Sequence, residues 1–138
     1  MGKSYVIGLD YGSDSVRATL VDAHTGEQAA EAVHAYRRWA QGLYCDAANS
    51  RFRQHPLDYL EGLEAVISGV LDARRDLAPY VRAIAVDTTA STPCLADEHL
   101  MPLALQERYK DNPDAMFVLW KDHTGEAEAE EINRACKE

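Results

Sequence analysis

The chain has 138 residues, of which 46% are hydrophobic and 27% charged, with a formal net charge of -9. This length and apolar content are enough for a globular domain with a core, while the acidic balance disfavours nucleic acid and anionic membranes as partners. No apolar run is long enough for a membrane helix or a signal peptide, and Cys45, Cys94 and Cys136 fit neither a disulfide framework nor a zinc site. We therefore expect a cytoplasmic, soluble protein.

The first 37 residues predict three strands joined by tight turns. Residues 4–10 form a nearly continuous apolar run that ends in Asp10, as a buried central strand does, and residues 15–22 alternate between apolar and polar side chains. Residues 27–37 are rich in alanine and glutamate, which favour helix. Two turns placed so close together favour a third strand instead, which completes an antiparallel meander.

The middle of the chain predicts one long helix and several short strands. Residues 39–54 show no period and predict a loop, and Pro56 then suits the first turn of a helix. Apolar residues recur from there at steps of three and four, which predicts one buried stripe. The stripe consists of Leu57, Leu60, Leu63, Ile67, Val70 and Leu71. Residues 81–87 predict a second buried strand, and residues 94–97, 101–105 and 116–120 predict shorter ones.

The last segment, residues 124–138, predicts a helix with a thin apolar face. Glutamates gather near its start, and Arg134 and Lys137 lie near its end, which complements the helix dipole. The helical pattern continues to the end of the chain without a glycine stop. We therefore expect the chain to be a piece of a longer protein.

Polar clusters follow three of the apolar runs. The clusters are Asp10 with its turn, Asp87 with Thr88 and Thr89, and Trp120 with Lys121, Asp122 and His123. Ligands of open α/β sheets bind beyond the carboxyl ends of the strands, so three adjacent runs would bring the clusters to one pocket. A single aspartate at a strand end is as often a simple turn former, but the repeated layout favours function.

The turn after Asp10 has the composition of a phosphate site. Gly12 and Ser13 are small and would leave backbone N–H groups accessible, and Arg17 could add charge-assisted hydrogen bonds. Asp10 would repel phosphate directly, but it would hold Mg²⁺ or the water shell of the ion. Neither GxxxxGK[ST] nor GxGxxG occurs, which excludes the two commonest phosphate-binding motifs.

Three other interpretations use the same residues. An Asp122–His123 dyad lacks an evident nucleophile, and Cys94 reads as a small buried hydrophobe rather than as a reactive thiol. Asp10, Asp87 and Asp122 could surround two metal ions, as in a nuclease, but the charge of -9 and the lack of a basic stripe oppose this. A non-catalytic binding module of the same fold stays open.

The sequence "GLDYGSDSVRATLVD" at residues 8–22 resembles the first phosphate loop of the sugar kinases related to glycerol kinase and xylulokinase. That family belongs to the superfamily of actin, hexokinase and the seventy-kilodalton heat-shock chaperones. Three further segments resemble its L-ribulokinase branch: "GLYCDAANSRFRQHPLDYLE", "AVDTTASTPCLAD" and "NPDAMFVLWKDHTGEAEAEEIN". The segments cover nearly the whole chain in family order, and "MFVLWKDHT" before an acidic helix is the most specific.

The resemblance implies an α/β, ribonuclease-H-like domain: a mixed sheet that begins with an antiparallel three-strand meander and is flanked by helices. Residues 1–138 would form the N-terminal part of the first of two lobes, incomplete at the C-terminus. The complete protein would use ATP and Mg²⁺ to convert L-ribulose to L-ribulose 5-phosphate in L-arabinose catabolism, with xylulokinase or another pentulose kinase as the nearest alternative. The general-base aspartate and the adenosine-binding lobe would follow residue 138, so the chain alone is expected to be inactive. Formation of a homo-oligomer is left open.

The resemblance also implies roles for individual residues. Asp10 would organise the metal, and Gly12, Ser13, Asp14 and Arg17 would line the ATP phosphates. Thr89, Ala90 and Ser91 match the segment in which glycerol kinase carries an Arg-Glu pair for its substrate. Ala90 and Ser91 stand there instead, which implies a wider, less charged pocket and a substrate other than glycerol. Trp120, Lys121 and Asp122 would form the second sugar-facing segment.

Overall fold

The structure is a computed structural model that describes residues 2–137. The chain divides into two compact units. The first unit consists of the residues up to Gln41 together with Leu57–Ala90, and the second consists of Gly42–Pro56 together with the residues from Ser91 onward. Within residues 2–137, no helix is both long enough and apolar enough to cross a membrane.

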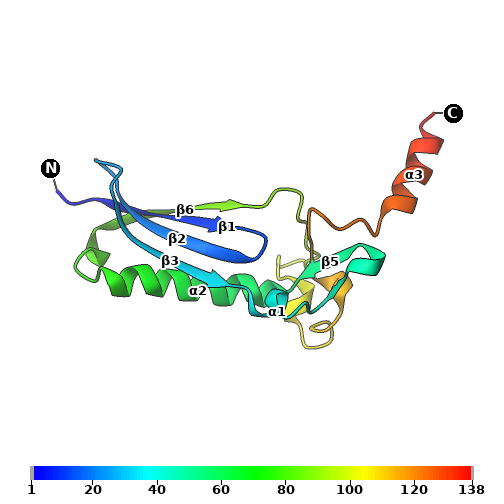
Figure 1. Cartoon of the computed structure of the whole chain (residues 1–138), viewed down its shortest axis with the longest axis horizontal. Helices are drawn as coiled ribbons and strands as arrows, with labels where there is room; N and C mark the ends of the chain where they lie inside the picture. The colour runs from blue at the N-terminus through cyan, green and yellow to red at the C-terminus, as the bar shows by residue number, and fades with distance from the viewer. Residues whose placement is uncertain (1, 138) are drawn as a thin grey trace. The chain divides into compact units, whose positions relative to one another are not determined.

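A four-stranded mixed sheet forms the frame of the first unit (Figure 1). Its strands are β1 (Tyr5–Tyr11), β2 (Ser15–Asp22), β3 (Gln28–Ala35) and β6 (Val81–Thr88), in the order β3-β2-β1-β6. The first three strands pair antiparallel, whereas β6 runs parallel to β1. The predicted meander is therefore confirmed. The remaining elements of this unit are α1 (Arg37–Ala40), α2 (Pro56–Ala73) and the 3₁₀ helix η2 (Ala78–Tyr80).

The alanines of β3 explain why this segment is a strand rather than a helix. Ala30 and Ala32 pair with Leu20 and Ala18 of β2, which are buried on the side of the sheet that faces α2. A Cβ atom on Gly69 of α2 would lie only 2.8 Å from the Cβ of Ala32. Small side chains are thus needed where α2 approaches the sheet, and strand pairing with this packing outweighs the local helix propensity of alanine.

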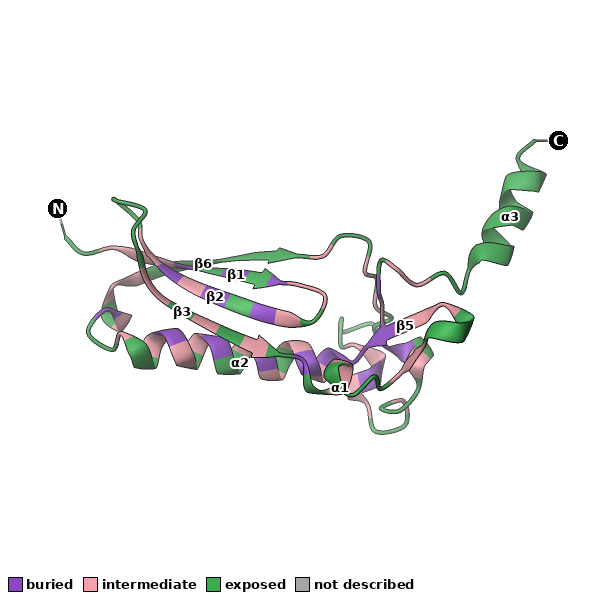
Figure 2. Ribbon diagram, in the orientation of Figure 1, coloured by how far each residue is buried: buried purple, intermediate pink, exposed green. Residues whose placement is uncertain are grey.

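The hydrophobic core of the first unit lies between the meander and α2, where alternate residues of β1 and β2 are buried (Figure 2). It consists of Ile7, Leu9, Tyr11, Val16, Ala18, Leu20, Tyr36, Val66, Val70 and Leu77. Three tyrosines form a stack within this unit: the Tyr59 ring of α2 lies parallel to those of Tyr11 and Tyr36, with centroids 5.2 and 5.1 Å apart. The stack fixes α2 close to the end of β1, where the turn to β2 begins.

Two strands are less buried than their apolar sequences predict. The β1 strand is buried only on the side that faces α2, and Gly8 and Asp10 on its other side are exposed. The predicted burial of β6 is wrong, because β6 is an edge strand on which Ile84 and Val86 are 54% and 61% exposed. An apolar run is buried only where another element covers it, and α2 packs against β1 to β3.

The second unit has a small antiparallel sheet of its own. Its strands are β4 (Cys45–Asp46), β5 (Arg51–Gln54) and β7 (Phe117–Val118), in the order β4-β5-β7. Its helices are the 3₁₀ turns η1 (Ala47–Asn49), η3 (Leu103–Leu105) and η4 (Pro113–Ala115), and α3 (Glu126–Ala135). The predicted C-terminal helix is confirmed by α3, whose residues are all exposed.

Three sequence predictions are corrected in this part of the chain. Residues 39–54, predicted to be a loop, include β4 and β5. The short strands predicted at residues 94–105 are reduced to one bridge between Ala96 and Pro102. The β7 strand pairs with β5 and not with β6, so the three polar clusters do not lie along one sheet. Strands of two to four residues carry too short a pattern to reveal which partner they pair with.

We expect Gly62→Ala to destabilise the first unit. A Cβ at this position of α2 would lie 2.6 Å from Val16 Cγ1, and Val16 is fully buried and stiff about χ1. The clash outweighs the gain in helix propensity, so thermal or urea unfolding of the chain should show a loss of about 1–3 kcal/mol. The matched control is Ser68→Ala on the exposed side of α2, which should leave stability unchanged or slightly raised. Equal stability of both variants would contradict the tight approach of α2 to β2.

Candidate functional site

A tight turn at residues 12–14 joins β1 to β2 and contains three of the predicted phosphate-binding residues. The Gly12 N–H donates to the Ser15 carbonyl across 2.9 Å, and the Ser15 hydroxyl donates to Asp14 Oδ1 across 3.2 Å. The Tyr36 N–H donates to the Asp14 carbonyl across 2.9 Å, which ties the turn to the end of β3. The turn is therefore anchored to the meander on both sides.

The hydrogen bond that closes the turn changes what Gly12 can offer a ligand. Its N–H donates to Ser15, whereas the sequence predicted that this group would be accessible to phosphate. A Cβ at position 12 would lie 3.3 Å from the Ser15 carbonyl oxygen, so the tight closure itself favours glycine. The role of Gly12 in phosphate binding stays a prediction, and the structure gives it a clear structural role in the turn.

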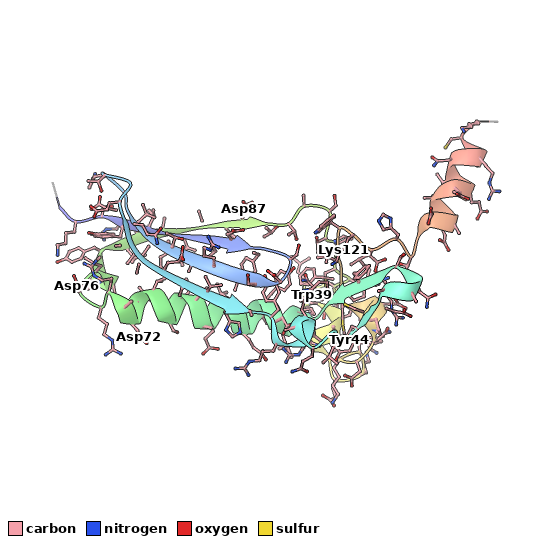
Figure 3. The ribbon with its side chains drawn as sticks, in the orientation of Figure 1. Trp39, Tyr44, Asp72, Asp76, Asp87 and Lys121 are labelled. Carbon is pink, nitrogen blue, oxygen red and sulfur yellow. The ribbon has the colours of Figure 1, made fainter. Side chains whose placement is uncertain are left out.

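A row of three charged residues crosses the sheet next to this turn. Asp10 pairs with Arg17 of β2 on one side and with Asp87 of β6 on the other. Residues paired in this way point to the same face of a sheet and lie about 5 Å apart. The row lies on the face opposite α2, and all three side chains are exposed; Figure 3 shows Asp87 on β6. Two carboxylates beside a guanidinium can bind a divalent cation and an anion together.

The loop after β6 carries the predicted substrate-binding residues Thr89, Ala90 and Ser91. The Thr89 N–H donates to the Tyr11 carbonyl across 3.2 Å, which continues the pairing of β6 with β1 as far as the turn. Ser91 has a positive φ of 57°, which is uncommon for a residue other than glycine. The first unit ends at Ala90, so Ser91 belongs to the second.

Trp120 and Lys121 occupy the two central positions of a turn in the second unit. The Asp122 N–H donates to the Leu119 carbonyl across 2.8 Å and closes this turn. The Lys121 Nζ lies 4.6 Å from the centre of the Phe52 ring, and Figure 3 shows Lys121 near β5. Trp120 remains 57% exposed. The turn thus presents one large aromatic side chain to solvent.

The Asp122 carboxylate is almost completely buried, with 1% of the side chain exposed. Its Oδ2 accepts from the Phe52 N–H at 2.7 Å and from Arg53 Nε at 2.8 Å. Its Oδ1 accepts from the Thr124 hydroxyl at 2.6 Å and from the Thr124 N–H at 3.1 Å. Burial alone would raise the pKa of Asp122, but the hydrogen bonds from Thr124, Phe52 and Arg53 outweigh it and lower the pKa to about 2.

This pKa predicts that Asp122 makes stability sensitive to acid. The pKa is 3.8 before folding and about 2 in the folded chain, so the stabilisation is complete above pH 4 and is lost as the pH falls toward 2. The loss amounts to about 2 kcal/mol. Urea unfolding between pH 6 and pH 2 should therefore fall less steeply for Asp122→Asn than for the wild type. Parallel curves would show that the hydrogen bonds to the carboxylate do not stabilise its charged form.

The contacts of the Asp122–His123 pair and of Cys94 suit structural roles rather than catalytic ones. The Asp122 carboxylate accepts hydrogen bonds from Phe52, Arg53 and Thr124, and the neighbouring His123 donates its N–H to the Ser50 carbonyl across 2.9 Å. This arrangement does not favour a catalytic dyad. Burial raises the pKa of the Cys94 thiol, in keeping with an unreactive cysteine. Within residues 2–137, no group of three or more His, Cys, Asp or Glu side chains is arranged to hold a metal ion.

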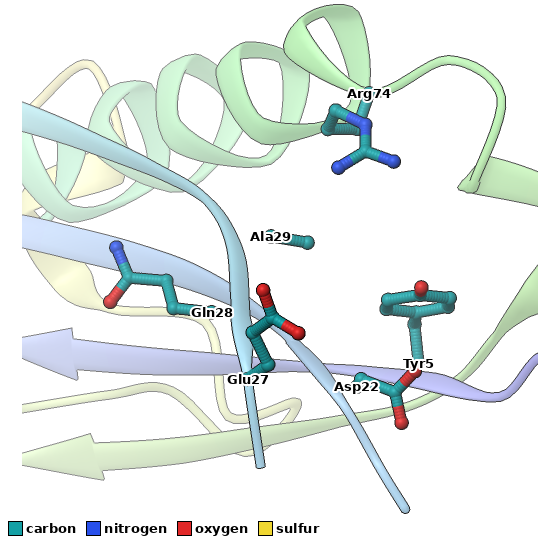
Figure 4. Close-up of a pocket in the computed structure, with 6 residues that line it drawn as sticks. All are labelled: Tyr5, Asp22, Glu27, Gln28, Ala29 and Arg74. Atoms are coloured by element: carbon teal, nitrogen blue, oxygen red, sulfur yellow. The ribbon is translucent and has the colours of Figure 1, made fainter. Parts of the chain in front are cut away.

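A separate depression of about 270 Å³ lies at the far end of β1 from the turn (Figure 4). It is lined by Tyr5, Asp22, Glu27, Gln28, Ala29 and Arg74. Tyr5 pairs with Asp22 at the start of β1, about 20 Å from the turn at its end. Arg74 Nε pairs with Asp76 Oδ1 at 3.0 Å, and N–H groups of His24 and Thr25 lower the pKa of Asp22. None of the predicted site residues lies here.

Sequence reasoning missed Arg53, which turns out to contact Asp122. Arg53 is 8% exposed in its side chain, and its guanidinium also donates to the Thr124 hydroxyl at 2.9 Å and to Asp114 at 3.4 Å. The run from Arg51 to Gln54 is too short to show a strand period, and arginine usually indicates an exposed position. Its partners lie about 60 to 70 residues away along the chain, so no local signal could identify them.

No protein-family model matches the chain, but individual relatives do. Over 132 residues it is 52% identical to a ribulokinase of Vibrio parahaemolyticus, a match that spans 95% of this chain and 23% of the relative. A ribulokinase of Halalkalibacterium halodurans is 37% identical over 142 residues, which span 99% of this chain and 25% of the relative. The chain is homologous to the ribulokinases. It spans about a quarter of the length of these relatives.

A solved structure supports the fold. The ligand-bound xylulose kinase of Lactobacillus acidophilus superposes with a TM-score of 0.69 over 96% of this chain and 23% of its own, at 14% identity. The fold expected from the resemblance is therefore confirmed: a mixed sheet with an antiparallel meander, flanked by helices, as in one part of the sugar kinases. The ribulokinase relatives likewise confirm the sugar kinase resemblance of the sequence.

Proposed function

We propose that the protein containing this chain is an ATP-dependent ribulokinase, which phosphorylates L-ribulose to L-ribulose 5-phosphate in L-arabinose catabolism in the cytoplasm. The observation that carries the proposal is 52% identity to a ribulokinase over 95% of the chain. Residues 1–138 would form the N-terminal part of the first of two lobes. Because they span about a quarter of the ribulokinases, the general base and the adenosine site would lie elsewhere in the protein, and this chain alone would be inactive.

The turn and the charged row of the first unit suit the phosphates of ATP. Gly12, Ser13, Asp14 and Arg17 would line the phosphates. Arg17 and Ser13 would donate to phosphate oxygens, while Gly12 and Asp14 also keep the turn in shape. The exposed carboxylates of Asp10 and Asp87 offer oxygen ligands side by side, which fits Mg²⁺, since this ion commonly takes one or two carboxylates and completes its shell with water and phosphate. When bound, Mg²⁺ neutralises charge on the transferred phosphoryl group.

The sugar would contact residues of two segments, Thr89–Ala90–Ser91 and Trp120–Lys121–Asp122; in the second segment, the contacts would come from the Trp120–Lys121 turn that Asp122 closes. The Trp120 indole, 57% exposed at the centre of its turn, offers an apolar face for the C–H side of a sugar. Thr89, Ser91 and Lys121 would supply polar groups for sugar hydroxyls. The small side chain of Ala90 leaves room for a substrate longer than glycerol.

Release of ADP by the complete protein, given Mg·ATP and L-ribulose, tests the proposal. We expect turnover with L-ribulose by the complete protein and none by residues 1–138 alone. D-Xylulose serves as the comparison substrate, and a higher kcat/KM with it would assign the protein to the xylulokinases. Lack of turnover with either sugar would favour a different sugar or a binding role for the fold.

A further inference from the structure

The row of backbone hydrogen bonds between β5 and β7 in the second unit ends at a side chain, the Asp122 carboxylate. The β7 strand pairs with β5 through Phe117 and Val118, and the Leu119 N–H extends the ladder by donating to the Phe52 carbonyl across 3.1 Å. The next acceptor is the Asp122 carboxylate, which receives the Phe52 N–H at 2.7 Å. The chain turns at Trp120 and Lys121 between these two contacts, so Asp122 fixes the end of the turn to β5.

The Asp122 carboxylate has little capacity left for a ligand. A carboxylate accepts about four hydrogen bonds, and Asp122 already accepts from Phe52, Arg53 and twice from Thr124. Its side chain is 1% exposed. A sugar hydroxyl could reach it only by displacing one of these donors.

Arg53 of β5 also binds the residues that follow the Trp120–Lys121 turn. Its guanidinium donates to Asp122 Oδ2 at 2.8 Å and to the Thr124 hydroxyl at 2.9 Å, so one planar group holds two of the three residues that directly follow Trp120 and Lys121. Arginine suits this role because its fixed fork of donors loses less freedom than a flexible ammonium would. Lys121 packs over the ring of Phe52, the neighbour of Arg53 on β5.

We propose that Arg53 and Asp122 are positioning residues for sugar binding, which hold the Trp120–Lys121 turn in place and do not themselves contact the sugar. This inference rests on the proposed function, since it takes the turn to face the substrate. A rigid turn keeps the Trp120 indole at a fixed position without loss of freedom on binding. Looser attachment would cost affinity for the sugar while leaving the ATP phosphates unaffected.

The test compares Arg53→Lys, Asp122→Asn and Thr124→Val in the complete protein, with Arg51→Lys as the matched control on the same strand. We expect each of the three variants to raise the KM for L-ribulose about tenfold or more, since small misplacements near a substrate have effects of this size. The KM for ATP should change less than about twofold, and the double variant of Arg53 and Asp122 should be no worse than either single variant, because both break one arrangement. Arg51→Lys should match the wild type.

Two outcomes would overturn the proposal. If Asp122→Asn raises the KM for the sugar but Arg53→Lys and Thr124→Val do not, Asp122 binds the sugar directly. If all three variants leave this KM unchanged, the turn keeps its position for sugar binding without these contacts. Thr124→Val is the mildest change and decides the matter if the other two variants fail to fold.

Hydrogen–deuterium exchange separates this inference from the proposed function. If the wild type phosphorylates no pentulose, exchange in a peptide covering residues 117–125 still reports on the turn. Faster exchange in Arg53→Lys and Thr124→Val, but not in Arg51→Lys, would support the positioning role with another substrate in place of L-ribulose. Equal exchange in the wild type and in all three of these variants would overturn the positioning role.

Discussion

Asp10→Asn is expected to lower Mg²⁺-dependent turnover of the complete protein by about a thousandfold or more, because metal stabilisation of phosphoryl transfer is worth several kcal/mol. Asp10 is exposed at the centre of the charged row, and asparagine has nearly the same shape, so the fold should be unaffected. The measurement is kcat as a function of Mg²⁺ concentration, with circular dichroism and thermal unfolding as tests of the fold.

Glu31→Gln is the matched control for Asp10→Asn. Glu31 is an exposed carboxylate of the same sheet, and it lies 4.0 Å from Arg17, so its loss removes one negative charge and only a long, exposed ion pair with the row. Turnover of this control should stay within about twofold of the wild type, since exposed ion pairs are weak. Normal turnover in Asp10→Asn would remove Asp10 from the mechanism. Equal losses in both variants would indicate a general effect of charge rather than a metal ligand.

Asp58→Ala is expected to lower the free energy of unfolding of the first unit by about 3 kcal/mol, because it removes one partner of a buried ion pair. The Asp58 side chain is 1% exposed. It accepts from Arg38 Nη1 at 2.8 Å and from the N–H groups of Arg38 and Trp39 at 3.3 and 3.2 Å. These contacts tie the start of α1 to α2, and urea unfolding measures their loss.

Glu61→Ala separates the buried contact from the exposed one. Glu61 also binds Arg38, with both oxygens 3.0 Å from the guanidinium, and this pairing lowers the pKa of Glu61. Its side chain is 41% exposed, so water screens the pair and we expect a loss of at most about 1 kcal/mol. A loss for Asp58→Ala no larger than that for Glu61→Ala would show that the bonds of Asp58 to the backbone contribute little.

The turn between β1 and β2 is the part of the candidate site whose geometry the sequence predicts best. Asp10, Gly12, Ser13 and Arg17 lie within eight residues of one another, and strand alternation places Asp10 and Arg17 on one face once the hairpin is recognised. The position of Asp87 beside them follows from parallel pairing of β6 with β1, which joins residues 77 positions apart. The sequence shows an aspartate at the end of both strands, but only the pairing of β6 with β1 shows that the two lie side by side.

The polar cluster after β7 shows the limit of sequence reasoning. The sequence shows Trp120, Lys121 and Asp122 as equivalent neighbours, each suited to a sugar. The structure separates them: Trp120 is 57% exposed, Lys121 packs on Phe52, and Asp122 is buried against Arg53. Residue type indicates which bonds a side chain can make, but burial and distant partners decide which bonds it does make.

Local sequence patterns are sufficient to predict the meander, the helix α2 and the family resemblance, because strand alternation, helical spacing and turn residues act between near neighbours. Three features become visible only in the folded chain: β6 lies at an edge, β7 joins a separate sheet, and Arg53 holds Asp122. Each of these depends on contacts between residues far apart in the chain. Such contacts form where the whole arrangement buries apolar surface and satisfies polar groups, which no local pattern encodes.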